Sequence, residues 1–198
     1  MKVKQIFIDV ETTGLSPIDH GLVQVAGAIV IGGRKMQTFD YLMCPPSLKT
    51  FQQRALEVIG RSMDEIETFD KSADIFKIFH KMLCKYVNPF DKVDKFQFIA
   101  YNSPFDADFI RQWFTDNDNK YYGSIFWTPD ICVMRKAGDY LQDERYKLKN
   151  FRLETVCKHL NIDTKGDLHD AMVDVALTMR LYKSLGGSTT ENQGELKL

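Results

Sequence analysis

The order of apolar and polar segments predicts an α/β domain built on a mixed five-stranded sheet, flanked by helices on both faces. Three apolar, β-branched segments come first, and apolar segments then alternate with segments of helical periodicity. Neighbouring strands followed by strand–helix alternation are typical of a mixed sheet covered by helices. A chain of 198 residues can bury about 70% of its unfolded surface, so we expect one compact domain.

Five segments have the character of strands: residues 4–10, 22–31, 36–43, 96–101 and 125–130. The first strand is followed by the turn residues of segment 12–17. Four residues join the second and third strands, which suits a hairpin and makes the first three strands antiparallel neighbours.

Helices are predicted where apolar residues recur at helical spacing or where capping residues stand. Ser62 and Glu65 have the spacing of a capping box, and Ser103 with Pro104 supplies an N-cap followed by proline. The expected helices cover residues 62–86, 104–114, 131–136, 151–160 and 168–185. We expect one domain over residues 1–185 and a flexible tail over residues 186–198, which are poor in apolar side chains.

Composition narrows the class of protein. The formal net charge is −1, which argues against nonspecific coating of nucleic acid but allows an enzyme that contacts a few nucleotides. The four cysteines are far apart with no CxxC pair, so we expect reduced thiols rather than a zinc site or disulfides. No apolar run approaches 18 residues and the N-terminus does not resemble a signal peptide, so we expect a cytoplasmic protein without a membrane segment.

Two carboxylates stand at the end of the first strand. Asp9 and Glu11 are two residues apart, so both side chains point to the same face. Without compensation they repel each other and their pKa values rise, whereas a divalent cation removes that penalty. Solvated charges at a strand terminus are the alternative interpretation.

Asp106 lies one turn into the helix after Ser103, where it could join the same site or could satisfy the helix N-terminus. Asp108 is expected to be a surface charge. Asp170 and Asp174 are four residues apart on one helix face. His169 is five residues from Asp174, about 140° away, so spacing alone favours the aspartate pair unless His169 precedes the first regular turn.

These residues carry a resemblance to the DEDDh 3′→5′ exonucleases, the superfamily that includes the proofreading subunit of bacterial DNA polymerase III. Residues 9–15 (DVETTGL) resemble the first motif, residues 102–106 (NSPFD) the second, and His169 with Asp174 the third. Order and spacing agree over residues 4–185. Tyr101 departs from the pattern because many relatives have histidine there, and nothing basic stands near residues 58–60.

The resemblance implies an RNase H-like fold and hydrolysis of phosphodiester bonds from a 3′ end, with release of nucleoside 5′-monophosphates. It implies two divalent cations, Mg²⁺ or Mn²⁺, held by Asp9, Glu11, Asp106 and Asp174. His169 would be the general base that activates water. Asp170 would then be a bystander, in contrast with the spacing argument.

The resemblance also indicates substrate-binding residues, namely Thr12, Thr13, Gly14, Leu15, Asn102 and Phe105. Leu15 and Phe105 would contact terminal bases. The basic cluster Lys147, Lys149 and Arg152 could contact phosphates or form a solvated face. Residues 193–198 (QGELKL) loosely resemble peptides that bind bacterial sliding clamps.

The expected substrate is a DNA 3′ end in proofreading or repair, with a polymerase or a sliding clamp as partner. The closest alternative is the same chemistry on RNA ends, because one sequence does not reveal how the pocket treats the 2′-OH. A noncatalytic nucleic-acid-binding module is the alternative from a different class.

Overall fold

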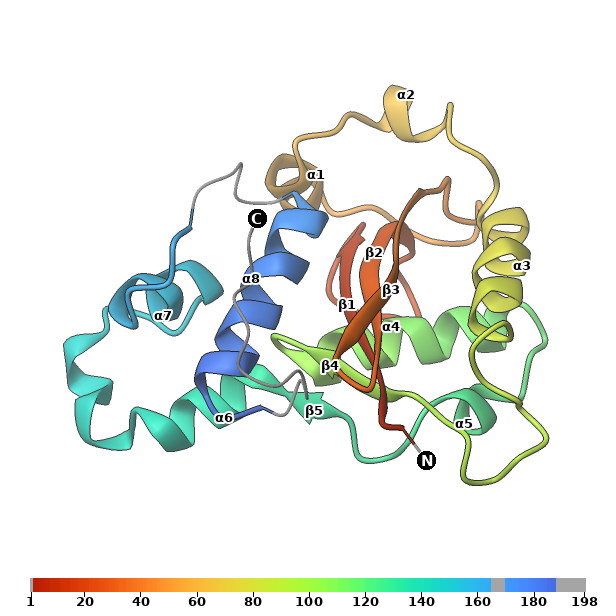
Figure 1. Cartoon of the computed structure of the whole chain (residues 1–198). Coiled ribbons are helices and arrows are strands. Elements are labelled where there is room, and N and C mark those ends of the chain that lie inside the picture. Colours follow the sequence, from red (N-terminus) through yellow and green to blue (C-terminus); the bar gives the residue numbers. More distant parts are fainter. Residues whose placement is uncertain (1, 165–169, 188–198) are drawn as a thin grey trace.

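The computed structural model describes residues 2–164 and 170–187. One five-stranded sheet has the order β3-β2-β1-β4-β5 (Figure 1). Its strands are β1 Lys4–Thr12, β2 Leu22–Ile31, β3 Arg34–Leu42, β4 Gln97–Ala100 and β5 Ile131–Cys132. The first three strands are antiparallel neighbours, whereas β4 and β5 add in parallel, so the prediction of a mixed five-stranded sheet is confirmed.

The hairpin between β2 and β3 is tighter than predicted. Gly32 and Gly33 both have positive φ angles, +57° and +84°, and Ile31 pairs directly with Arg34. Two central residues with positive φ form the turn whose twist matches that of the flanking strands. The third strand therefore begins at Arg34, two residues before the predicted start.

Helices surround the sheet. They are α1 Gln53–Ile59, α2 Met63–Ile66, α3 Ser72–Leu83, α4 Ser103–Asp116, α5 Tyr122–Ile125, α6 Val133–Tyr140, the 3₁₀ helix η1 Gln142–Lys147, α7 Leu153–His159 and α8 Ala171–Ser184. The hydroxyl of Ser62 caps α2, as the capping-box pattern predicts.

The prediction of a strand over residues 125–130 was wrong. Ile125 ends a short helix, and Phe126 makes one isolated bridge to Phe96. Pro129 has no amide N–H to donate to a sheet and interrupts the segment. The fifth strand comes after it, at Ile131–Cys132, where a helix had been predicted.

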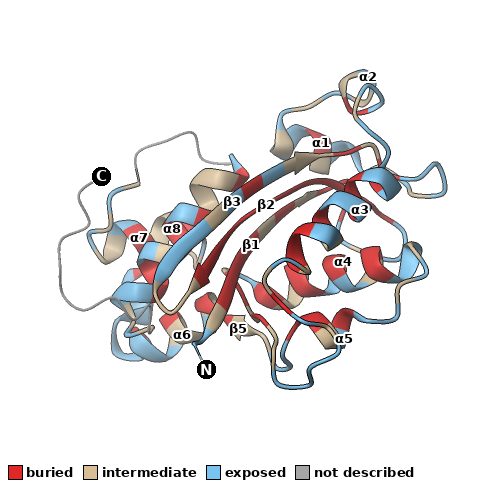
Figure 2. Ribbon diagram, turned by 45° about the vertical axis from the view of Figure 1, so that its right-hand side comes forward, coloured by how far each residue is buried: buried red, intermediate tan, exposed pale blue. Residues whose placement is uncertain are grey.

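The core is divided by the sheet. The even-numbered side chains of β1, from Ile6 to Val10, pack on the face covered by α3, α4 and α5. Phe7 points to the opposite face, against α6, α7 and α8. Figure 2 shows buried residues along both faces of the sheet and along the helix sides that meet it. Helices on both faces confirm the predicted architecture.

Two further expectations concern the cysteines and the membrane. All four cysteines are free thiols, with Cys132 and Cys157 buried and Cys44 and Cys84 half-buried. Among the described residues, we find no helix with the length and apolar character that crossing a bilayer requires.

We expect Phe79→Ala to lower the free energy of unfolding by about 3–5 kcal/mol, because the truncation leaves a cavity in a close-packed core. Phe79 is fully buried between the rings of Phe39 and Trp113. Phe90→Ala is the matched control, since that ring is 94% exposed and its removal should change stability by no more than about 0.5 kcal/mol. Urea denaturation measures both, and equal midpoints for the two variants would contradict the assignment of this core.

Candidate active site

The candidate site lies where β1 separates from β4. The two strands pair only from Gln5 to Phe7 of β1, and β1 continues alone on that edge to Thr12. On its other edge β1 stays paired with β2 as far as Thr12, with a register shift after Glu11. The carboxyl end of β1 is therefore held by one neighbour and open toward α4.

Asp9 and Glu11 share one face of β1, as their spacing predicts. Both are half-buried and lie on the side of Phe7, whereas Val10 is buried on the opposite side. The expectation that two carboxylates meet at this strand end is met by the backbone alone, because β1 keeps a regular alternation up to Glu11.

Helix α8 runs antiparallel to β1 on this face. Near its carboxyl end, Tyr182 contacts the start of β1: its ring centroid is 5.6 Å from that of Phe7, and its hydroxyl lies 3.5 Å from the Gln5 side chain. Asp174 lies in the first turn of α8. Burial raises the pKa of both Asp9 and Glu11, and the negative charge of Asp174 raises both further.

Asp106 reaches the site from the other face of the sheet. It lies in the first turn of α4 and is 4% exposed. Its carboxylate accepts hydrogen bonds from the backbone N–H of Val10 and from its own N–H. Asp106 thus lies at the N-terminus of α4 and close to the open edge of β1 at Val10.

The carboxylates destabilise one another's charged forms. Burial raises the pKa of Asp106 to about 8, with additional repulsion from Glu11 and Asp130. Burial and Asp174 raise the pKa of Glu11 to about 7. Burial, Asp106, Glu11 and Asp174 raise the pKa of Asp9 well above its ordinary value. Within the part of the chain that the structure describes, the charged groups that shift these three pKa values are all carboxylates.

Hard carboxylate oxygens that repel one another fit a divalent cation by their chemistry. Within residues 2–164 and 170–187, no three His, Cys, Asp or Glu side chains are grouped closely enough to hold a metal ion by themselves. An open arrangement suits Mg²⁺, which usually keeps several water ligands and takes only one or two carboxylates.

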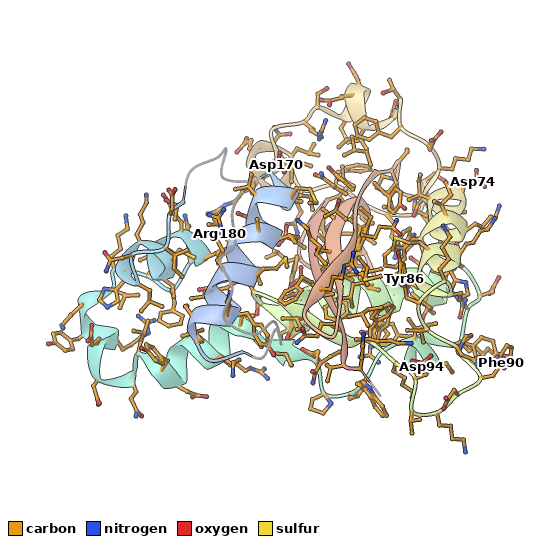
Figure 3. The ribbon with its side chains drawn as sticks, in the orientation of Figure 1. Asp74, Tyr86, Phe90, Asp94, Asp170 and Arg180 are labelled. Atoms are coloured by element: carbon orange, nitrogen blue, oxygen red, sulfur yellow. The ribbon has the colours of Figure 1, made fainter. Side chains whose placement is uncertain are left out.

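The structure separates the roles of Asp170 and Asp174. Asp170 is the N-cap of α8, and its carboxylate accepts hydrogen bonds from the amides of Met172 (2.8 Å) and Val173 (3.4 Å). Figure 3 shows Asp170 at the start of this helix. The spacing of Asp170 and Asp174 favoured a pair on one helix face, but the Asp170 carboxylate is instead bound to the helix N-terminus. His169 lies outside the described residues.

The loop after β1 is buried at its base and exposed at its tip. Thr12, Thr13 and Gly14 are buried, whereas Leu15 is 77% exposed. The ring of His20 lies where a side chain at Gly14 would stand, with its nearest atom 2.2 Å from the Cβ position. Only glycine fits there, so the loop passes directly over the imidazole.

The remaining candidate residues differ in their positions. Asn102 is exposed at the start of α4. Phe105 is half-buried, and its ring centroid lies 4.9 Å from that of Phe109, so it is part of the core margin. The basic cluster is exposed on η1 and the segment before α7, and Lys147 pairs there with Glu144 at 3.4 Å.

The sequence analysis missed Asp130. Its carboxylate accepts a hydrogen bond from the buried hydroxyl of Ser103, and its charge raises the pKa of Asp106. Ser103 is therefore the first residue of α4 and a partner of Asp130, while Asn102 is the N-cap residue and makes no side-chain cap bond. An acidic residue directly before a strand was the available signal, hidden by the strand wrongly predicted over residues 125–130.

Tyr101, where the sequence departs from the family pattern, directly follows β4 and makes a structural contact. Its hydroxyl donates a hydrogen bond of 2.7 Å to the carbonyl of Phe151, just before α7. Burial raises the pKa of the phenol, so this link stays neutral.

Comparison with known proteins gives relatives of two kinds. The chain is 27% identical over 194 residues to the DNA polymerase III PolC-type of Oceanobacillus iheyensis, covering 96% of this chain but 12% of that protein. It is 24% identical over 192 residues to the DNA polymerase III subunit epsilon of Rickettsia prowazekii, covering 93% and 75% of the two chains.

Solved structures share the fold. Exonuclease I of E. coli in complex with a dA16 oligonucleotide superposes with a TM-score of 0.71 at 23% identity, covering 92% of this chain and 41% of that one. The RNase H-like exonuclease fold implied by the resemblance is thereby confirmed. The model of the RNase T exonuclease family, a family of phosphodiester hydrolases, matches residues 6–182. This chain belongs to that family.

Proposed function

We propose that this protein is a divalent-cation-dependent 3′→5′ exonuclease that hydrolyses phosphodiester bonds from the 3′ end of DNA and releases nucleoside 5′-monophosphates. The observation that carries the proposal is the meeting of Asp9, Glu11, Asp106 and Asp174 from β1, α4 and α8, with the pKa values of the first three raised.

These four carboxylates would hold the cations, which neutralise charge on the attacking and leaving oxygens of an in-line displacement. The protein's own contribution is placement. Asp9 and Glu11 are fixed by the pairing of β1 with β2, and Asp106 by the amide of Val10. Asp174 is carried by α8, which packs along β1 through Tyr182.

His169 is proposed as the general base that takes a proton from water, on the strength of its motif. An imidazole with an ordinary pKa near 6.5 suits that task at neutral pH. His169 itself lies outside the described residues.

For the substrate, we propose that Leu15 and Phe105 contact the terminal bases and that Thr12, Thr13, Gly14 and Asn102 line the pocket. Leu15 is a large apolar side chain exposed to solvent in the loop that follows Glu11, which suits contact with a base. DNA is favoured over RNA because two relatives are DNA polymerase III proteins.

The partners follow from the same relatives. The chain spans only 12% of the PolC-type relative and 41% of the exonuclease I chain, so association with a polymerase is proposed and not shown. The clamp-binding peptide proposed at residues 193–198 also lies outside the described residues.

We expect Asp9→Asn to abolish cleavage of a 5′-labelled single-stranded DNA oligonucleotide, since the side chain keeps its size but loses its charge. Wild-type protein with Mg²⁺ or Mn²⁺ should give a ladder shortening from the 3′ end, and EDTA should stop it. The same assay on an RNA oligonucleotide of matched sequence compares the two polymers. The one that is degraded faster, DNA or RNA, is the preferred substrate.

The control for this experiment is Asp108→Asn, an exposed residue on α4 two positions from Asp106. Its ladder should match that of the wild type, whereas Asp106→Asn should lose activity. A ladder shortening from the 5′ end, or unchanged cleavage by Asp9→Asn, would refute the proposed function. Binding of the oligonucleotide without cleavage would instead support the noncatalytic module.

We expect Asp174→Asn to be inactive and Asp170→Ser to retain near wild-type turnover. Serine keeps an oxygen that accepts the amides at the start of α8, so the helix should lose at most about 1 kcal/mol. His169→Ala should lower turnover by roughly 10²-fold or more. Steady-state rates measure the turnover of each variant, and circular dichroism shows whether it is folded. An inactive but folded Asp170→Ser protein would reverse the assignment of the third motif.

Without divalent cations, the protein should become less stable as the pH rises. The raised pKa values of Asp9, Glu11 and Asp106 mean that their protonated forms are favoured in the folded state. Their stabilising contribution is complete below the unfolded pKa values near 4 and is lost as the pH passes about 7 and about 8.

Thermal melts in EDTA should therefore show a melting temperature that falls between about pH 5 and pH 8.5. Added Mn²⁺ or Mg²⁺ should raise it, and by more at the higher pH, since cations compete with protons for the same oxygens. Asp9→Asn should melt higher than wild type in EDTA at pH 8 and should respond less to the cation. A cation effect that is absent at every pH would argue against this site.

A further inference from the structure

Outside the carboxylate cluster, one lysine has a side chain that is largely buried. The side chain of Lys49 is only 8% exposed, although lysine is almost never buried without partners. Its ammonium group donates to the carbonyls of Pro17 (3.0 Å) and Ile18 (2.8 Å) and pairs with the carboxylate of Asp116 at 3.0 Å. Three acceptors match the three protons of the ammonium group.

The partners of Lys49 belong to two elements that the proposed chemistry needs together. Pro17 and Ile18 lie in the loop between β1 and β2, whose tip carries Leu15. Asp116 is the last residue of α4, whose first turn carries Asp106. Lys49 thus connects the loop beside the carboxylates to the far end of a helix that supplies one of them.

Neighbouring residues hold the same loop through the backbone. The carbonyl and hydroxyl of Thr13 contact Gln52 and Thr50, each at 2.7 Å, and the amide of Thr50 donates to Asp19 at 2.7 Å. These bonds fix the two ends of the loop. Lys49 joins the middle of the loop to α4 through two hydrogen bonds and one ion pair.

The loop presents apolar side chains to water although it is well held. Leu15 is 77% exposed and Ile18 is 72% exposed. Large apolar groups exposed on an ordered loop beside a candidate site indicate a surface for contact with a ligand.

We propose that Lys49 is a positioning residue for substrate: its ammonium group holds the loop of Leu15 and Ile18 in register with α4, so that a terminal nucleotide is seated against the carboxylates. This inference rests on the proposed exonuclease function. It assigns to Lys49 no contact with the nucleotide, which the side chain could not make while all three of its protons are engaged.

The test compares two substrates in wild type and Lys49→Met, which keeps an unbranched side chain without charge. A single-stranded DNA oligonucleotide uses the loop, whereas bis(p-nitrophenyl) phosphate has a phosphodiester but no base. We expect KM for the oligonucleotide to rise about tenfold with kcat changed less than about threefold, because ground-state binding is lost. Hydrolysis of the small phosphodiester should stay at the wild-type rate.

Three further variants sharpen the result. Lys77→Met is the matched control, because Lys77 also pairs with a carboxylate, Asp74 at 2.8 Å, but both side chains are exposed. It should behave as wild type. Lys49→Arg should restore most of the affinity. The double variant Lys49→Met with Leu15→Ala should bind the oligonucleotide about as tightly as the weaker of the two single variants. The two effects should not add, because both residues act through one loop.

Hydrogen–deuterium exchange gives a readout independent of catalysis. Amides of residues 13–21 should exchange faster in Lys49→Met and in Asp116→Asn, and at the wild-type rate in Lys77→Met. If Lys49→Met does not fold, Asp116→Asn carries the test alone, since it removes the charge that pairs with Lys49.

In the kinetic test, either of two results would overturn the inference: a wild-type KM for the oligonucleotide in Lys49→Met, or an equal loss on both substrates together with a lower melting temperature. The second result would make Lys49 a scaffold residue only. If wild-type protein hydrolyses neither substrate with Mg²⁺ or Mn²⁺, the proposed function itself fails, and unchanged exchange at residues 13–21 would show separately that Lys49 does not hold the loop.

Discussion

The separation of β1 from β4 beyond Phe7 is the constraint on which the rest of the site depends. If β4 stayed paired to the end of β1, the backbone of β4 would accept the hydrogen bond of the Val10 amide. Because the pairing stops, that amide is free to bind the carboxylate of Asp106, and α4 is anchored with its first turn against the open strand. The same opening leaves Asp9 and Glu11 half-buried on the opposite face, where α8 brings Asp174.

Stability and proposed function make opposite demands on this site. Burial and mutual repulsion raise the pKa values of Asp9, Glu11 and Asp106, so the folded protein holds charges that it would be more stable without. The fold tolerates them because the surrounding core is extensive, with aromatic rings on one face of β1 and aliphatic side chains of α6 to α8 on the other. Repulsion of this kind is what a cation relieves, and this links the cost in stability to the proposed chemistry.

Much of the fold could be predicted because the strands and longer helices carry their own periodicity. β2 was predicted to the residue, and the same-face placement of Asp9 and Glu11 followed from alternation alone. The fifth strand could not be predicted, because Ile131–Cys132 is only two residues long and is held by parallel pairing with Ile99 and Ala100, which no local pattern reveals. The contact of Ser103 with Asp130 was missed for the same reason, since it joins residues 27 positions apart.

The two aspartates of α8 show where spacing stops being informative. Positions four apart share a helix face only when both lie inside the helix, and Asp170 is the cap, with an extended backbone (φ −83°, ψ 115°) and a carboxylate turned to the amides of Met172 and Val173. One residue's difference in where the helix begins therefore decides which aspartate faces β1. Lys49 is a second example. It follows a segment with two prolines and a serine, a pattern typical of a loop, and only the fold shows that its side chain is largely buried. Long-range contacts, rather than local pattern, determine which charged groups are held inside the protein and beside the carboxylates.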